Sequence, residues 1–327
     1  MTQNLSEIVV TTLESRTGKL ADNVTDNNAL LTRLNTRGNI DFVSGGSEIL
    51  QELEYAENGT AMYYSGYETL DLTPQRVMDA GRFSFKQAAV GVSISGLEEL
   101  QNDGEERVIS LLKSRIGNAE RTMKNLISSG IYSDGTGSGG KQIGGLQFLV
   151  SSTPTTGTVG GFDRSSSSNS WWRNQTTTFS ALSLTAGSDT IQSAMNNLYM
   201  KTHRGNDNTD LIVADNVYFT YYLESLQALV RIQDTNSDIG KLGFQNLKFM
   251  NGTDVVLDGG IGGNMPASTM YFLNTDYIHY RPHIRRNMVV DQSERKPLNQ
   301  DAMCRLILWA GNMTLSNAQL QGVLTAS

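Results

Sequence analysis

The chain has 327 residues, of which 38% are hydrophobic and 18% charged, and its formal net charge is −7. This apolar content is enough for a core and excludes a wholly disordered chain, whereas the acidic balance excludes a basic nucleic-acid-binding domain, which needs clustered Lys and Arg. A single cysteine, Cys304, excludes intramolecular disulfides and cysteine-rich zinc sites. The start lacks the pattern of a secretory signal, and no apolar run approaches the roughly 18 residues of a membrane span.

Two short helices are predicted near the start of the chain. Apolar residues recur at helical spacing over residues 5–13 and again over 22–37, where Gly38 is the expected stop. The segment has too few large apolar side chains to bury a core of its own. We therefore expect residues 1–37 to be an arm that lies across a neighbouring subunit and not on their own core.

An acidic hairpin is predicted over residues 47–73. Asn58 and Gly59 give a turn signal between two β-capable runs. The segment contains no basic residue and six carboxylates, which belong to Glu48, Glu52, Glu54, Glu57, Glu68 and Asp71. These acids indicate either a solvated hairpin with a charged edge or a projecting loop that meets a basic partner.

A strand over residues 82–95 and the longest helix of the chain, over 105–129, are predicted next. Capping-box patterns begin at Ser95 and Asp103. Apolar residues from 108 to 127 mark one face of the long helix, with Gly130 as the expected stop. Its other face carries four cations, which are Lys113, Arg115, Arg121 and Lys124.

Residues 151–180 are predicted to form an exposed excursion, because fifteen of these thirty residues are Ser or Thr. Trp171 and Trp172 need a partner surface, so we expect both to be at least partly buried and residues 165–168 to be exposed. A helix over 189–203 and a helix capped by Asp215 then alternate with strands, which indicates a mixed α+β domain. The strands are expected at residues 211–214, 255–257, 270–273 and 303–308.

Motifs that would carry chemistry are incomplete. Residues 135–141 match G-x-x-x-x-G-K, but Gln142 stands where a phosphate-binding loop needs Ser or Thr. His279 and His283 lie about 13 Å apart in an extended run, too far to share a metal, and are expected at the surface. Cys304 is expected in the core. We therefore predict no catalytic, cofactor-binding or metal-binding residue, and no enzyme.

The order of these pieces resembles the major capsid protein of tailed bacteriophages with the Hong Kong-type fold. The likeness rests on residues 127–146 (ISSGIYSDGTGSGGKQIGGL), 269–282 and 286–324. It implies an α+β fold with an N-terminal arm and an extended β-hairpin loop. The implied parts are the arm at 1–37, the extended loop at 38–82, a peripheral domain at 83–130 with the long helix as its spine, an axial domain at 131–278, peripheral return strands at 279–310 and an axial C-terminal tail at 311–327.

The resemblance also implies a function. Such a subunit self-assembles as hexamers and pentamers into an icosahedral virion capsid, which encloses double-stranded DNA without sequence-specific binding. It is made in the host bacterial cytoplasm, contacts no membrane, and can work with a cement or decoration protein, a portal and a scaffolding protein. One alternative is the shell of an encapsulin-like nanocompartment, which shares the fold. A second alternative is an unrelated β-rich enzyme or adhesin.

The resemblance places the extended loop over the peripheral domain of a neighbouring subunit. Residues 38–75 contain no Lys for a covalent crosslink, so the contact would be non-covalent. We predict that the six hairpin carboxylates pair across the subunit boundary with the four cations of the long helix and with Arg281, Arg285 and Arg286. The alternative is that these acids only keep the free subunit soluble.

Overall fold

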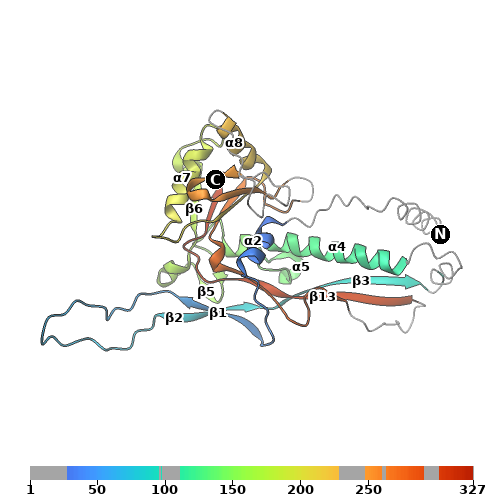
Figure 1. The fold of residues 1–327 in the computed structure, drawn as a ribbon, viewed down its shortest axis with the longest axis horizontal. Coiled ribbons are helices and arrows are strands. Elements are labelled where there is room, and N and C mark those ends of the chain that lie inside the picture. The colour runs from blue at the N-terminus through green and yellow to red at the C-terminus, as the bar shows by residue number, and fades with distance from the viewer. Residues whose placement is uncertain are drawn as a thin grey trace.

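The computed structural model describes residues 28–95, 97, 111–227, 247–259, 263–290 and 302–326. The molecule is elongated, with an α/β body, a long helix lying along a sheet on one side, and a two-stranded ribbon that projects on the other side (Figure 1). The helix expected at 5–13 and the capping patterns after Ser95 lie outside the described residues.

A six-stranded sheet forms the body. Its strand order is β6 (Gln175–Thr178), β14 (Gly322–Thr325), β10 (Thr269–Leu273), β7 (Leu211–Ala214), β9 (Asp254–Leu257) and β8 (Leu247–Lys248). Helices α7 (Ile191–Lys201) and α8 (Asn216–Gln227) bury their apolar faces in a core shared with these strands. Asp215 caps α8 by accepting a hydrogen bond from the Tyr218 N–H at 3.0 Å. The predicted helix over 189–203, the predicted strands of this sheet and the Asp215 cap are confirmed.

A second sheet is built around β13 (Ala302–Leu315), the longest strand. β13 pairs with β3 (Lys86–Ser95) on one side and with β11 (Ile278–Pro282) and β12 (Val289–Val290) on the other. The predicted strand over 82–95 divides at Phe85 into β2 (Met78–Ser84) and β3, and the predicted strand over 303–308 is confirmed within β13. Helix α4 (Leu111–Ile131) packs against β3 and β13 (Figure 1).

The long helix is confirmed from Leu111 onward, with two differences. Ala119, Met123 and Ile127 are buried as expected, but Leu126 is 47% exposed. Gly130 does not end the helix, which continues to Ile131. A Cβ on Gly130 would lie 3.0 Å from the Ile143 side chain. The glycine therefore allows close packing and does not act as the stop.

The ribbon consists of β1 (Glu48–Glu54) and β2, which pair antiparallel. The predicted hairpin over 47–73 is therefore wrong about the second strand. A turn does form at Asn58, whose carbonyl accepts from the Ala61 N–H at 3.2 Å, but the chain continues to residue 77 before it pairs. The register sets Ile49 opposite Phe83, and both are buried. This burial outweighs the local turn signal.

Helix α2 (Ala29–Arg37) corrects the prediction for the arm. Asn28 caps its first turn and Gly38, at φ 77°, ends it as expected. However, Leu30 and Leu34 are fully buried in the chain's own core. Residues 28–37 therefore belong to the body, and the expectation that they do not lie on their own core is wrong. Residues 1–27 lie outside the described part.

Two arginines also fix α2 to the body. Arg33 lies 3.2 Å from Asp210 and 3.5 Å from Asp254, and these two carboxylates are only 11% and 9% exposed. Arg37 lies 3.3 Å from the same Asp210 and 3.5 Å from Asp276. These four aspartate contacts join α2 to the starts of β7 and β9 and to the turn before β11.

One buried carboxyl makes stability depend on pH. Asp258, just after β9, accepts a hydrogen bond from the Tyr132 hydroxyl at the end of α4. Burial raises the pKa of Asp258 to about 6, although the Tyr132 hydroxyl and the Ala29 N–H act in the opposite direction. The folded protein therefore holds this proton at pH values where the unfolded chain has lost it. The stability contributed by the protonated form is present below about pH 4 and is lost as pH rises through 6.

We expect Asp258→Asn to raise the free energy of unfolding by about 2–3 kcal/mol at pH 8, because Asn removes the buried charge and still accepts the bond from Tyr132. At pH 4, where Asp258 is already neutral, the effect should be small. Urea unfolding at both pH values measures this, with the exposed Glu68→Gln as the control. Equal effects of Asp258→Asn at pH 4 and pH 8 would show that the carboxyl does not titrate in this range.

Candidate subunit-contact surface

The loop between β1 and β2, residues 55–77, extends away from the body (Figure 1). Its apolar side chains are exposed. Tyr63 and Tyr67 are fully exposed and Leu72 is 86% exposed, and Met62, Tyr64 and Leu70 are exposed as well. A single exposed apolar residue is ordinary, but six on one projecting loop mark an interaction surface.

Local hydrogen bonds shape this loop without using those side chains. Asn58 Oδ1 accepts from the Thr60 N–H at 3.1 Å, and Glu68 Oε2 accepts from the Ser65 N–H at 3.0 Å. Asp71 Oδ1 accepts from both the hydroxyl and the N–H of Thr73, and these bonds hold the pKa of Asp71 below its usual value. Polar side chains thus set the turns, which leaves the tyrosines and leucines for a partner.

The predicted acidic residues lie on the ribbon and the loop. β1 alternates, so that Glu48, Leu50, Glu52 and Glu54 are exposed while Ile49, Gln51 and Leu53 are buried. Glu57 lies 3.5 Å from Arg204 of the same chain. Glu68 and Asp71 make the turns described above. The glutamates of β1 are therefore exposed, and Glu52 and Glu54 also line the cleft between ribbon and body.

The predicted cations lie elsewhere on the subunit. Arg285 and Arg286 are exposed after β11, beside the exposed Phe42 and Ile284, and we call these four residues the basic patch. Arg286 also donates to Gln87 Oε1 at 3.3 Å. Arg281 is half-buried, donates to Gln51 Oε1 at 2.8 Å and lies 3.6 Å from Asp41.

The cations of α4 have different environments. Arg115 donates to the Ser93 carbonyl of β3 at 2.7 Å. Arg121 is half-buried and Lys124 is exposed on α4, and the Lys113 side chain lies outside the described residues. Among the described residues, none of Arg281, Arg285 and Arg286 forms an ion pair with any of the six predicted carboxylates. Arg204, which pairs with Glu57, was not predicted, because it is a single cation in a polar turn.

The 151–180 excursion is confirmed in outline. Trp172 is buried, Trp171 is half-buried, and residues 165, 167 and 168 are exposed, although Ser166 is half-buried. The excursion contains β4 (Thr158–Val159), β5 (Phe162–Asp163) and the 3-10 helix η1 (Ser167–Trp172). The prediction of an exposed excursion is wrong for its last part, because β6 pairs with β14 in the sheet of the body.

Arg164, which no pattern in the sequence marks, fixes the excursion from inside. It is fully buried and donates to the carbonyls of Leu149 at 2.6 Å and Trp172 at 3.0 Å. Burial lowers the pKa of Arg164 to about 10, so it is still charged at neutral pH. A Ser/Thr-rich segment is thus held in one shape by a guanidinium that satisfies its carbonyls.

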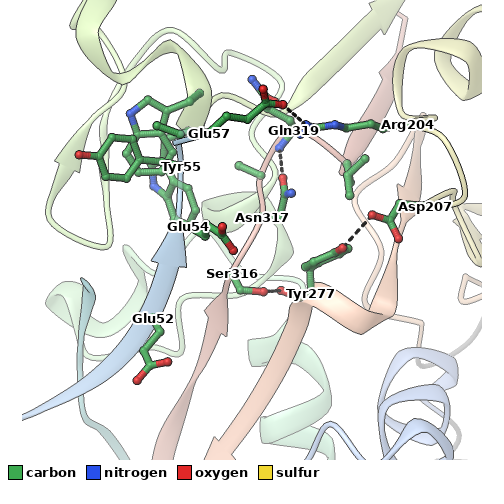
Figure 2. A pocket seen from close by; sticks show the side chains of 15 residues that line it. Glu52, Glu54, Tyr55, Glu57, Arg204, Asp207, Tyr277, Ser316, Asn317 and Gln319 are labelled. Carbon is green, nitrogen blue, oxygen red and sulfur yellow. Dashed lines mark hydrogen bonds and ion pairs between the residues drawn. The ribbon is translucent and has the colours of Figure 1, made fainter. Parts of the chain in front are cut away.

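A cleft of about 480 Å³ separates the ribbon from the body. Figure 2 shows Glu52, Glu54 and Glu57 on the ribbon side and Arg204, Asp207 and Tyr277 on the body side, with Glu57 directed toward Arg204. Tyr277 donates to Asp207 at 3.0 Å. Residues 316–320 complete the lining. The cleft is open and polar, four of its five charged lining residues are acidic, and it lies at the base of the projecting loop.

The remaining motifs form local structure. Residues 135–141 make a turn around α5 (Gly137–Gly140), with Ser138 and Gly139 at positive φ. His279 is half-buried, and its Nδ1 lies 3.2 Å from Asp41, so its predicted surface position is wrong. Burial lowers the pKa of His279. Cys304 is half-buried and not fully in the core.

Among the described residues, no three His, Cys, Asp or Glu side chains are placed to hold a metal ion. No described helix is long and apolar enough to cross a membrane.

Comparison with solved structures identifies the fold. The chain is similar to a chain of the cyanophage A-1(L) capsid asymmetric unit, with 16% identity, 94% of each chain covered and a TM-score of 0.68. It is also similar to the capsid of a native GTA particle, with 12% identity, 94% of each chain covered and a TM-score of 0.56. The holo-SrpI encapsulin complex from Synechococcus elongatus PCC 7942 matches with 8% identity over 96% of this chain and 94% of that one, at a TM-score of 0.53.

Neither a protein-family model nor a curated protein sequence matches the chain. The structural likenesses extend over nearly the whole chain. They confirm the predicted α+β fold, which is that of phage capsid proteins and which the encapsulin shares.

Proposed function

We propose that the chain is the structural subunit of a phage capsid, which assembles as hexamers and pentamers into an icosahedral shell around DNA and is not an enzyme. One observation carries the proposal. The chain has the fold of the cyanophage capsid protein over 94% of its length, and it also projects a loop with exposed apolar side chains. No described residue of the same chain covers these side chains. A virion location and a cement, portal or scaffolding partner belong to the same proposal.

The loop gives this proposal its physical basis. Fully burying one Leu or aromatic side chain stabilises a contact by about 1.5–3 kcal/mol. Six such groups on a free subunit are a liability for solubility, but in a shell each subunit can cover its neighbour's loop. A heterologous contact of this kind closes into rings, which are the hexamers and pentamers proposed here.

The proposed parts follow the fold with two adjustments. The extended loop is residues 38–82, and the peripheral domain combines 83–130 with the return strands that begin at 279. β13 continues to Leu315, so the return strands would end there and not at 310. The axial domain would combine 131–278 with the C-terminal tail, and α2 would pack on it through Asp210 and Asp254.

We propose that the exposed glutamates of β1 and the loop meet the basic patch and α4 of a neighbouring subunit. The patch combines Arg285 and Arg286 with exposed Phe42 and Ile284, which matches a loop that combines carboxylates with tyrosines. Arg281 is the weakest member of the predicted set, because Gln51 and Asp41 already engage it. Each exposed pair would contribute about 0.2–1 kcal/mol, multiplied over the many copies of a shell.

Charge reversal tests this contact. We expect Glu52→Lys with Glu54→Lys to reduce the yield of assembled particles at low salt, and Arg285→Glu with Arg286→Glu to do the same. Combining the four substitutions should restore part of the yield, because opposite charges then meet again. The matched control is Glu224→Lys on α8, away from the loop. Unchanged yields from both double variants, measured by sedimentation, would remove the electrostatic part of the proposal.

A nanocompartment shell is a second candidate, since the SrpI encapsulin covers 96% of this chain. The contents of purified particles separate the two functions. A phage head yields particles that contain double-stranded DNA, whereas a nanocompartment yields particles of uniform size that contain a cargo enzyme. A chain that sediments only as a monomer or small oligomer would contradict both.

A further inference from the structure

The base of the projecting loop contains an arrangement that can set the loop's direction. We propose that Tyr55, held on Trp171, acts as a pivot for the ribbon, and that Glu57 and Arg204 act as a latch across the cleft beside it. The inference deepens the proposed function, because the direction of the loop would fix the angle between adjoining subunits of a shell.

Tyr55 is the last point at which the two sides of the ribbon are joined before the loop. Its N–H donates to the Val77 carbonyl at 3.1 Å, and its hydroxyl donates to the Arg76 carbonyl at 2.8 Å. Its ring stacks on Trp171, with a centroid distance of 4.9 Å and an interplanar angle of 27°. A rotation about this contact carries the whole of residues 56–76 with it.

The platform under Tyr55 is rigid. Trp171 meets Phe162 edge to face at 5.3 Å, and the neighbouring Trp172 is buried, with its Nε1 donating to the Val159 carbonyl at 2.9 Å. Buried Arg164 holds the same segment through two carbonyls. The platform is also hydrogen-bonded to β2, because the Arg82 N–H donates to the Gly160 carbonyl at 2.9 Å.

The cleft of about 480 Å³ between ribbon and body has Tyr55 and Trp171 in its lining as well. The ion pair that crosses this cleft joins Glu57 Oε1 to Arg204 Nη2 at 3.5 Å (Figure 2). The two side chains are 93% and 69% exposed. An exposed pair of this kind is weak and screened by salt.

The charges across the cleft oppose closure once the latch is broken. Glu54 on the ribbon and Asp207 on the body both line the cleft, and Asp207 already accepts from Tyr277 (Figure 2). With Arg204 paired to Glu57 the walls are held together, and without that pair like charges separate them. The ribbon thus has a pivot at Tyr55, where it stacks on Trp171, and a weak, charge-controlled latch at Glu57.

Distance measurement in the unassembled chain tests the pivot and the latch. Spin labels at Tyr67→Cys and Asn169→Cys, in a Cys304→Ser background, report the separation of the loop from the platform. We expect Arg204→Ala, and 0.5 M NaCl on the unsubstituted protein, to shift the distance distribution to longer values. Arg204→Lys should keep the original distribution, and Lys141→Ala is the matched control at an exposed site away from the cleft.

Trp171→Ala should broaden the distribution more than Arg204→Ala does, and Trp171→Phe, which keeps an aromatic surface, should restore most of it. A distribution that is the same in Arg204→Ala, in high salt and in the unsubstituted protein would overturn the latch. Because Arg204 is exposed, we expect Arg204→Ala to leave the fold intact. The distance measured in this variant therefore reports on the latch and not on unfolding. Because the distances are measured without assembly, they are independent of whether the chain forms a capsid.

Discussion

Replacing residues 58–74 by a short Gly-Ser linker is expected to abolish shell assembly while leaving the subunit folded. Tyr55 and Val77 are hydrogen-bonded at the base, so a short connection can close the ribbon. The loop removed carries six exposed apolar side chains, and we expect particle yield to fall at least about a hundredfold, since losing three buried side chains alone exceeds about 4 kcal/mol per contact. Sedimentation velocity and electron microscopy measure the yield, and the melting temperature reports the fold.

A milder variant separates the side chains from the backbone of the loop. Tyr63→Ser, Tyr67→Ser and Leu72→Ser together should give most of the defect of the deletion. Met200→Ser with Val217→Ser, at exposed apolar positions on α7 and α8, is the matched control and should assemble normally. Normal shells from the loop deletion would contradict the role given to this surface.

Replacing Arg33 is expected to have the largest effect on stability. Arg33→Leu leaves Asp210 and Asp254 without their closest cation at positions that are about nine-tenths buried. Breaking a buried pair by removing one partner typically costs about 3–5 kcal/mol. Urea unfolding at pH 7 measures the loss.

Arg37→Leu is the matched comparison for this prediction. Arg37 contacts Asp210 too, but its side chain is 41% exposed and its second partner, Asp276, is 58% exposed. Its replacement should therefore cost clearly less, about 1 kcal/mol. Equal costs for the two substitutions, or no cost for Arg33→Leu, would show that α2 is not fixed to the body by these ion pairs.

The elements that could be predicted from the sequence are those whose local pattern and burial agree. The strand at 211–214 is apolar throughout and fully buried, and Asp215 follows it as a helix cap. The local sequence pattern gave a wrong prediction where contacts between distant segments determine which residues are buried. Leu30 and Leu34 are too few to predict a core alone, yet they complete one built by distant segments.

The contact surface was predicted less completely. The acidic side of β1 follows from simple alternation, which the structure confirms. The buried guanidinium of Arg164 and the pairing of Glu57 with Arg204 depend on residues far apart in the fold, and no spacing in the sequence marks them. The turn at Asn58 could be predicted from the sequence. The strand that pairs with β1 could not, because that pairing is determined by the burial of Phe83 opposite Ile49.

The most direct test of the proposed shell function is a cryo-electron microscopy reconstruction of particles formed by the full chain. We predict closed icosahedral particles in which residues 59–73 of each subunit lie on a neighbouring subunit, with Tyr63, Tyr67 and Leu72 buried at the boundary. A chain that forms no closed particle, or a shell in which this loop contacts no neighbour, would contradict the proposal.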